Sequence, residues 1–236
     1  MSNGPSGSVS GEWADHAVDW SASSAGRANL YAWFSALFAA ELSESVIGAY
    51  QQGDAETLLV GLDAIGLTAE VERLQAAIGS WGKIPFLKQE LAADFAQLFL
   101  LDVKQSAMPY ASAYLDPEGQ LYGKPHQQMQ EFLRANGLQV HTAFKEPSDH
   151  LAVLLACMEA LIRQGLETSG DSRLRAASTQ VDFLRNALQT WLPTFVNQCQ
   201  QLGKNTVCDF YPALTALLRA FILEDIAFLE AASELA

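Results

Sequence analysis

The chain has 236 residues, of which half are hydrophobic and 17% are charged, so it is neither an intrinsically disordered chain nor a low-complexity chain. Its length allows one large domain or two small ones. Fourteen Lys and Arg residues against 27 Asp and Glu residues give a formal net charge of −13, which disfavours nucleic acid and anionic lipid as partners and favours a basic one.

Residues 1–11 are rich in glycine and serine and have no apolar periodicity, so we expect a disordered N-terminus. An N-terminal helical domain is predicted over residues 12–137. Its apolar residues recur at helical spacing in four segments, each ending at or near a glycine or before a proline. These segments contain Leu30–Phe38, Val46–Tyr50, Leu58–Ile65 and Val71–Ile78.

A longer helix is predicted to start near Pro85 and to run through Phe99. Residues 102–120 then lack periodicity, which predicts the longest loop of the folded region, and loops of this length are often functional. Pro125 opens the next helix, which ends at Asn136-Gly137.

Residues 138–148 are irregular again and are interpreted as a hinge loop, with Glu146 and Pro147 at its end. A C-terminal helical domain is predicted over residues 149–236, and its last helix starts at Pro212. Asp225 is the one acidic interruption of that helix's apolar stripe. With no period-2 segments of strand length, the fold class is all-α, and the hinge predicts both a monomer and a domain-swapped homodimer.

The cysteines and the N-terminus predict a cytoplasmic location. Cys157, Cys199 and Cys208 form no CxxC pair, so we expect buried thiols in a reducing compartment. The first 25 residues lack a positively charged start, and no apolar run approaches the length of a membrane span.

Most enzyme motifs are absent from the sequence, and no cofactor is predicted. There is no GxSxG, HExxH or GxGxxG. The segment Gly119–Pro125 resembles a phosphate loop only faintly, because it is one residue short between its glycines and lacks the Ser or Thr that would hold magnesium.

The segment from Glu146 to His150 has three interpretations. It could be a plain helix start, with Ser148 as the N-cap and Asp149 beside the positive end of the helix dipole. It could also form an all-α metal-dependent hydrolase site that uses Glu146, Asp149 and His150. A helix start does not explain the histidine, so we expect Asp149 and His150 to be partly exposed and to serve a client.

Aromatic residues accumulate in and before the loop of residues 102–120. Phe95, Leu98 and Phe99 fit a core stripe at helical spacing. Together with Tyr110 and Tyr114, they could instead line a half-exposed groove that binds an apolar peptide with a basic end. A passive scaffold whose loops are merely long is a further alternative.

Glu146-Pro-Ser-Asp-His150 resembles the E-P-x-D-H segment of the TorD/DmsD/NarJ family of redox-enzyme maturation chaperones. Other blocks occur in the order of that family, and the resemblance spans roughly residues 27 to 230. They are Arg27 and Tyr31 with Leu37-Phe38, LAADFAQLFL at 91–100, KQSAMPYASAY at 104–114, Trp191-Leu192-Pro193 with Phe195, and Phe210-Tyr211.

The resemblance implies an all-helical chaperone without enzymatic activity. It implies binding to the apo form of a molybdenum-cofactor enzyme and to its twin-arginine signal peptide, so that the client stays competent for cofactor insertion before export. Residues 91–114 are most similar to the branch of the family dedicated to trimethylamine N-oxide reductase. Carried over by position, the client-binding residues are Phe95, Leu98, Phe99, Tyr110, Ser112 and Tyr114 on one wall, with Pro147, Asp149 and His150 on the other.

Overall fold

The computed structural model describes residues 20–102 and 104–234, and the predicted disordered N-terminus at 1–11 lies outside them. Within the described residues the secondary structure is helical and contains no strand, which confirms the all-α prediction. The only pairing of β type in this part of the chain is one isolated bridge, between Tyr110 and His150.

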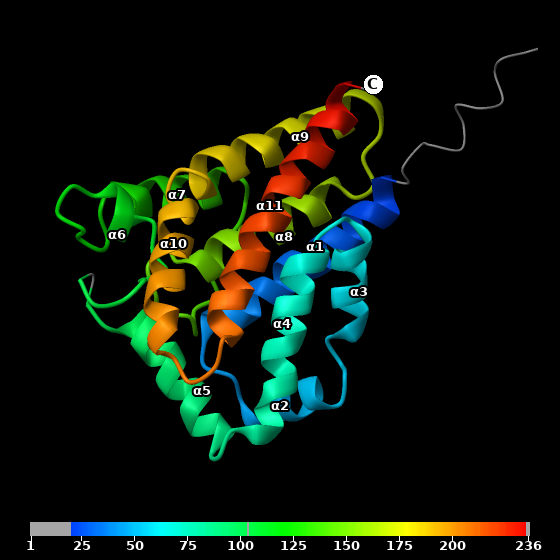
Figure 1. The fold of residues 1–236 in the computed structure, drawn as a ribbon. Helices are drawn as coiled ribbons and strands as arrows, with labels where there is room; N and C mark the ends of the chain where they lie inside the picture. The colour runs from blue at the N-terminus through cyan, green and yellow to red at the C-terminus, as the bar shows by residue number, and fades with distance from the viewer. Residues whose placement is uncertain (1–19, 103, 235–236) are drawn as a thin grey trace, which may run out of the picture.

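Eleven α-helices are present in the described residues (Figure 1). Before the predicted hinge they are α1 (Trp20–Ala39), α2 (Glu44–Gln51), α3 (Glu56–Ala64), α4 (Thr68–Ser80), α5 (Leu87–Phe95), α6 (Ser112–Leu115) and α7 (Lys124–Ala135). After it come α8 (Leu151–Gly165), α9 (Gly170–Phe183), α10 (Leu192–Leu202) and α11 (Phe210–Glu234). Helices α5 and α9 each end in a π turn, at Ala96–Leu100 and Leu184–Leu188.

Some predicted boundaries are wrong by a few residues. Helix α5 begins at Leu87 rather than near Pro85, because Phe86 takes a left-handed conformation with φ of 53°. Helix α11 begins at Phe210, since proline is tolerated within the first helical turn and Pro212 does not have to be the first residue. The long predicted loop contains the short helix α6.

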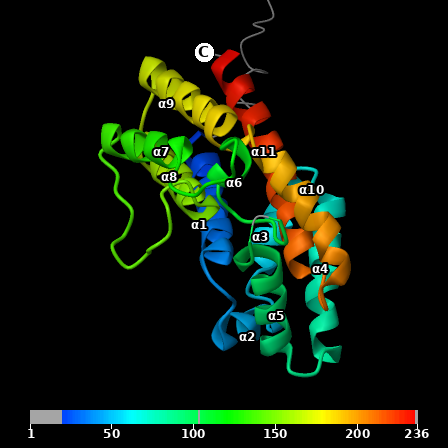
Figure 2. The same ribbon diagram turned by 90° about the vertical axis from the view of Figure 1, so that its left-hand side faces the viewer.

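The first and the last helix each pack against helices from other parts of the chain. Helix α1 lies along α8, and α11 packs against α4, α9 and α10 (Figures 1 and 2). A single hydrophobic core runs through helices on both sides of residues 138–148. The division into two domains with a hinge therefore stays a prediction.

A buried ion pair joins α1 to α11 and explains the acidic interruption of the last helix. Asp225 binds Arg27 through both carboxylate oxygens and accepts a hydrogen bond of 2.7 Å from the hydroxyl of Tyr31. Arg27 also donates to Gln180 Oε1 of α9 over 2.8 Å. Burial, and then the charge of Asp225, raises the pKa of Tyr31, so its hydroxyl keeps the proton that it donates.

We predict that Asp225→Ala lowers the free energy of unfolding by about 3–5 kcal/mol, because it leaves the Arg27 guanidinium charged and unpaired in the core. Urea unfolding of the purified variant measures this loss. Glu230→Ala is the control, since Glu230 pairs with Arg185 at the surface and should lose less than about 1 kcal/mol. Equal losses in the two variants would contradict the prediction.

Candidate functional site

Two segments far apart in the sequence are held side by side at the start of α6 and of α8. The Ala111 amide donates to the carbonyl of Asp149 over 3.1 Å, and the Leu151 amide donates to the carbonyl of Pro109 over 2.8 Å. The structure thus brings together the loop before α6 and the segment before α8, whereas their predicted role as two walls of a client-binding groove stays a prediction.

Asp149 lies at the centre of this contact, with 1% of its surface exposed. Its Oδ2 accepts hydrogen bonds from both the amide and the hydroxyl of Ser112. Within the part of the chain that the structure describes, its Oδ1 has no hydrogen-bond partner. His126 Nδ1 lies 3.9 Å from this Oδ1. However, the same nitrogen accepts a hydrogen bond from the Ser148 amide over 2.9 Å, so it has no proton to donate to Asp149. A buried carboxylate oxygen of this kind favours a ligand that donates a hydrogen bond.

His150 is the N-cap of α8, and the expectation that Asp149 and His150 are partly exposed is wrong. Only 4% of His150 is exposed, and its Nδ1 accepts from the Ala152 amide over 3.1 Å. Ser148 is therefore not the N-cap. Burial lowers the pKa of His150 to about 4, so the imidazole is neutral at pH 7, as an accepting nitrogen requires.

The predicted hinge residues are anchored to the same segment. The hydroxyl of Tyr110 donates to Glu146 Oε2 over 2.6 Å, and burial together with this bond raises the pKa of Tyr110. Pro147 is buried, whereas Glu146 is exposed. The ring of His150 packs edge-on against Tyr110, with ring centroids 4.8 Å apart. These contacts fix the chain direction into α8.

Three of the predicted groove residues belong to the core. Phe95, Leu98 and Phe99 are at most 4% exposed, and the ring of Phe99 packs edge-on against Tyr211. Tyr114 is half-buried and stacks on Trp191, with ring centroids 5.5 Å apart. Phe95, Leu98 and Phe99 are therefore available to a peptide only if the helices move, whereas Tyr114 is partly accessible. A role of these residues in peptide binding stays a prediction.

A cavity of about 440 Å³ opens beside Asp149, between α6, α7, α8 and α9. We call it the Asp149 cavity. Its walls are largely apolar, with one buried carboxylate and the exposed carboxylate of Asp182. The apolar lining includes Leu115, Met129, Phe132, Leu154 and Phe183. This arrangement suits a cationic donor on an apolar body.

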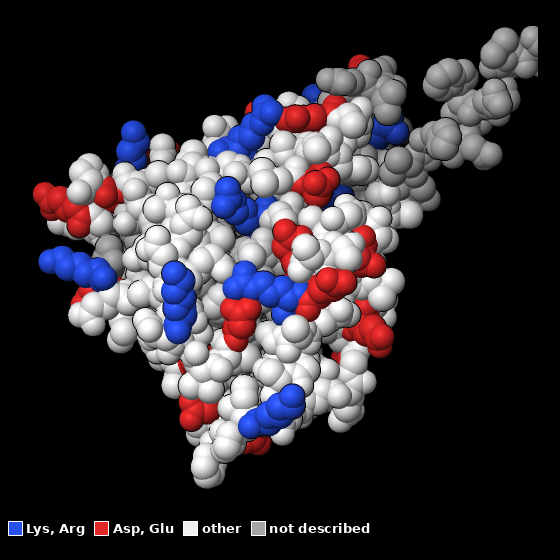
Figure 3. Space-filling model, viewed as in Figure 1, with Lys and Arg blue, Asp and Glu red and all other residues white. Residues whose placement is uncertain are grey.

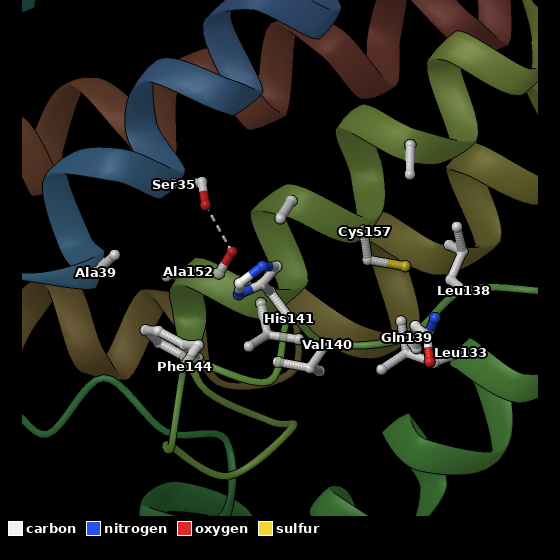
Figure 4. A pocket seen from close by; sticks show the side chains of 13 residues that line it. Ser35, Ala39, Leu133, Leu138, Gln139, Val140, His141, Phe144, Ala152 and Cys157 are labelled. Carbon is white, nitrogen blue, oxygen red and sulfur yellow. Dashed lines mark hydrogen bonds between the residues drawn. The ribbon is translucent and has the colours of Figure 1, made fainter.

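A second cavity, of about 300 Å³, lies under the predicted hinge loop (Figure 4). Val140 and Phe144 from the loop, Leu133 from α7 and Cys157 from α8 line it. Next to it, the Ser35 hydroxyl of α1 donates to the carbonyl of Ala152 over 2.8 Å. Helix α7 therefore contributes to the walls of both cavities.

The hydrolase alternative is not supported by the geometry. Glu146 is held by Tyr110, Asp149 by Ser112, and His150 by the amide of its own helix. Among the residues that the structure describes, no three His, Cys, Asp or Glu side chains are grouped so that they could hold a metal ion. The three cysteines are buried, as expected, and burial raises the pKa of Cys157 and Cys199 to about 12.

Sequence reasoning missed His126 and the apolar walls of the Asp149 cavity. His126 is 22 residues away from Ser148, to which it is hydrogen-bonded, and no spacing rule connects them. Helical periodicity marked Met129 and Phe132 as apolar-face residues, but it could not indicate that this face borders a cavity rather than packed core.

Comparison with known proteins places the chain in a family. Residues 63–197 match the family model described as nitrate reductase delta subunit. A protein of Psychrobacter sp. (strain PRwf-1) named "Chaperone protein TorD" is 39% identical over 222 residues, which are 93% of this chain and 99% of the relative. The chain belongs to the TorD chaperone family.

Other TorD chaperones are similar over most of their length. The one from Vibrio cholerae serotype O1 (strain ATCC 39541) is 40% identical over 201 residues, covering 84% of this chain and 90% of the relative. The one from Vibrio parahaemolyticus is 38% identical over 205 residues, covering 86% and 94%. These matches confirm the family resemblance of the sequence.

None of the helices in the described residues is both long enough and apolar enough to cross a bilayer.

We predict that His150 makes the protein acid-sensitive between pH 6.5 and about 4. In this range the unfolded chain binds a proton at His150 that the folded chain does not, so stability falls as the pH falls, by up to about 3 kcal/mol. His150→Asn keeps an N-cap acceptor but does not titrate, so it should lose less stability over this range. Urea unfolding at stepped pH measures both profiles, and parallel profiles would show that His150 does not carry the effect.

Proposed function

We propose that the protein is a cytoplasmic chaperone of a molybdoenzyme, trimethylamine N-oxide reductase. It binds the apo form of the reductase and its twin-arginine signal peptide and keeps the client competent for molybdenum cofactor insertion before export. The protein itself is not an enzyme and needs no cofactor in this proposal. The main support is membership of the TorD chaperone family over nearly the whole chain.

The unpartnered Oδ1 of Asp149 is the structural observation that carries the signal-peptide part of the proposal. A guanidinium group offers several N–H donors and a positive charge, so it matches a buried carboxylate oxygen that lacks a donor. The apolar walls of the Asp149 cavity suit the aliphatic part of the arginine and the apolar residues that follow it. Among the other predicted client-binding residues, Ser112 holds Asp149 in place through two hydrogen bonds.

The charge of the whole protein supports the same partner. A net charge of −13 attracts the basic start of a twin-arginine signal peptide, and this attraction is weakened by salt. Contacts between the apolar stretch of the peptide and the cavity walls do not depend on salt in this way. The affinity should therefore have one component that falls with ionic strength and one that persists.

We predict that Asp149→Asn weakens binding of a synthetic twin-arginine signal peptide at least tenfold, since it removes a charge-assisted hydrogen bond. The amide oxygen of the variant can still accept from Ser112, so the fold should remain intact. Calorimetry measures the affinity. Asp171→Asn, on an exposed carboxylate at the start of α9, is the control and should bind like the wild type.

A functional assay separates a chaperone role from peptide binding alone. Purified apo-reductase is incubated with molybdenum cofactor, with and without this protein, and reductase activity is followed. The wild type should increase the yield of active reductase, and Asp149→Asn should increase it less. No increase with the wild type would contradict the proposed chaperone function.

We also propose that residues 138–148 act as a hinge between the parts 12–137 and 149–236. Helix α1 lies along α8 across this loop, so the same contact can form within one chain or between two. Glu146 and Pro147, anchored as described, stiffen the end of the hinge.

We predict from this hinge that monomer and dimer coexist and interconvert slowly, because exchange requires breaking the whole interface between the two parts, which includes the α1–α8 contact and the Arg27–Asp225 ion pair. Size-exclusion chromatography of isolated fractions, repeated after days and after mild denaturant, tests this. A single species at every concentration, with no dimer after refolding, would contradict it.

A further inference from the structure

A groove between α1, α3 and α11 is larger than the two cavities around α7. Its volume is about 640 Å³, within the range of binding pockets for small ligands and side chains. We call it the α3 groove. Large apolar side chains form most of its walls, namely Leu30, Leu58, Ile65, Phe221 and Phe228.

The α3 groove lies on a different side of the molecule from the Asp149 cavity. Figure 1 shows α3 on the right and α6 and α7 on the left, and in Figure 2 α6 is in front while α3 lies behind it. No residue lines both hollows. A ligand in one therefore leaves the other free.

Two glycines inside helices keep the α3 groove wide. Gly26 of α1 and Gly61 of α3 both line it, and a Cβ atom added to either would meet nothing within 4 Å. Neither glycine has a positive φ, so the backbone conformation at these two positions does not require glycine. Glycine is the least favourable helix-interior residue after proline, and here no internal contact or turn requires it. These glycines leave space that the described residues do not fill.

The helices that flank the groove also carry exposed apolar side chains. Ile65, in the groove wall, is 46% exposed. Val60 on α3 is 60% exposed and Leu223 on α11 is 50% exposed. Large exposed apolar side chains on the helices that flank a hollow favour a surface that a partner covers.

The charges at the groove indicate which partner chemistry fits. Arg27 and Asp225 neutralise each other in the wall, which leaves the exposed Glu224 as the uncompensated charge of the lining. Glu56 and Asp63, both exposed, lie on α3 itself, and Figure 3 shows acidic side chains gathered on the side where Figure 1 places α3. A basic residue on the partner is therefore favoured.

One buried donor in the groove wall also lacks an acceptor. Arg27 is 7% exposed, and its Nη1 has no hydrogen-bond partner among the residues that the structure describes, although its other two nitrogens do. A peptide carbonyl oxygen can satisfy it, and the last turn of a helix offers free carbonyls together with a preferred position for basic residues.

We propose that the α3 groove binds an amphipathic helix of the folded part of the client, the part that follows the signal peptide. The apolar face of this helix fills the space above Gly26 and Gly61, and a Lys or Arg near its C-terminal end faces Glu224. This inference rests on the proposed function, since it takes the apo-reductase as the client. It adds a second binding surface that is separate from the Asp149 cavity.

The test uses two probes, apo-reductase without its signal peptide and the synthetic signal peptide alone. Gly61→Trp blocks the groove, and Glu224→Lys reverses its charge without adding bulk to the core. Matched controls are Gly48→Trp, at a helical glycine of α2 with equally open surroundings, and Glu72→Lys, at an exposed position of α4. Circular dichroism checks that each variant is folded, and calorimetry measures each affinity.

Both groove variants should bind the apo-reductase at least tenfold more weakly than the wild type does. Their affinity for the signal peptide should stay within twofold of the wild-type affinity. The two control variants should match the wild type with both probes. Wild-type affinity of Glu224→Lys and of folded Gly61→Trp for the apo-reductase would overturn the inference and leave the proposed function standing. If the groove variants lose affinity for the signal peptide instead of for the apo-reductase, the inference is overturned as well, because the α3 groove would then bind the signal peptide. A wild type that binds neither probe would refute the proposed function and this inference together.

Discussion

The buried ion pair between Arg27 and Asp225 fixes how the two ends of the chain meet. Two charges inside an apolar core are tolerated only when they are paired and hydrogen-bonded, so α1 and α11 have one acceptable relative position. Tyr31 and Gln180 complete the pairing and add α9 to the same cluster. Arg27 and Asp225 both lie in the wall of the α3 groove, so the same position of α1 and α11 shapes that groove.

The segment from Glu146 to His150 combines a structural role with the binding role that we propose. His150 caps α8 and Asp149 holds Ser112, so both side chains stabilise the fold. Oδ1 of Asp149 is buried and has no hydrogen-bond partner among the described residues, which leaves it for a ligand. Because the same residues serve both purposes, a loss of client binding after truncation to alanine has two explanations. Substitutions that preserve shape and hydrogen bonds, but remove the charge or the titration, separate them.

The two hollows differ in chemistry, which suits a chaperone that holds two parts of one client. The Asp149 cavity has a carboxylate without a donor, whereas the α3 groove has apolar walls and a guanidinium nitrogen without an acceptor. An isolated cationic segment fits the first, and a helix with free carbonyls fits the second.

The sequence by itself determined the all-α class, most helix positions, the burial of the cysteines and the family. Apolar periodicity and the motif blocks are local properties, so no tertiary contact is needed to recognise them. Periodicity also marked Asp225 as an exception within an apolar stripe, but only the tertiary structure showed that Arg27, 198 residues away, is its partner. In the same way, the motif Glu146 to His150 was evident, whereas its burial was not. Burial, the free Oδ1 of Asp149 and the two hollows depend on contacts between helices far apart in the chain, and sequence spacing carries no information about such contacts.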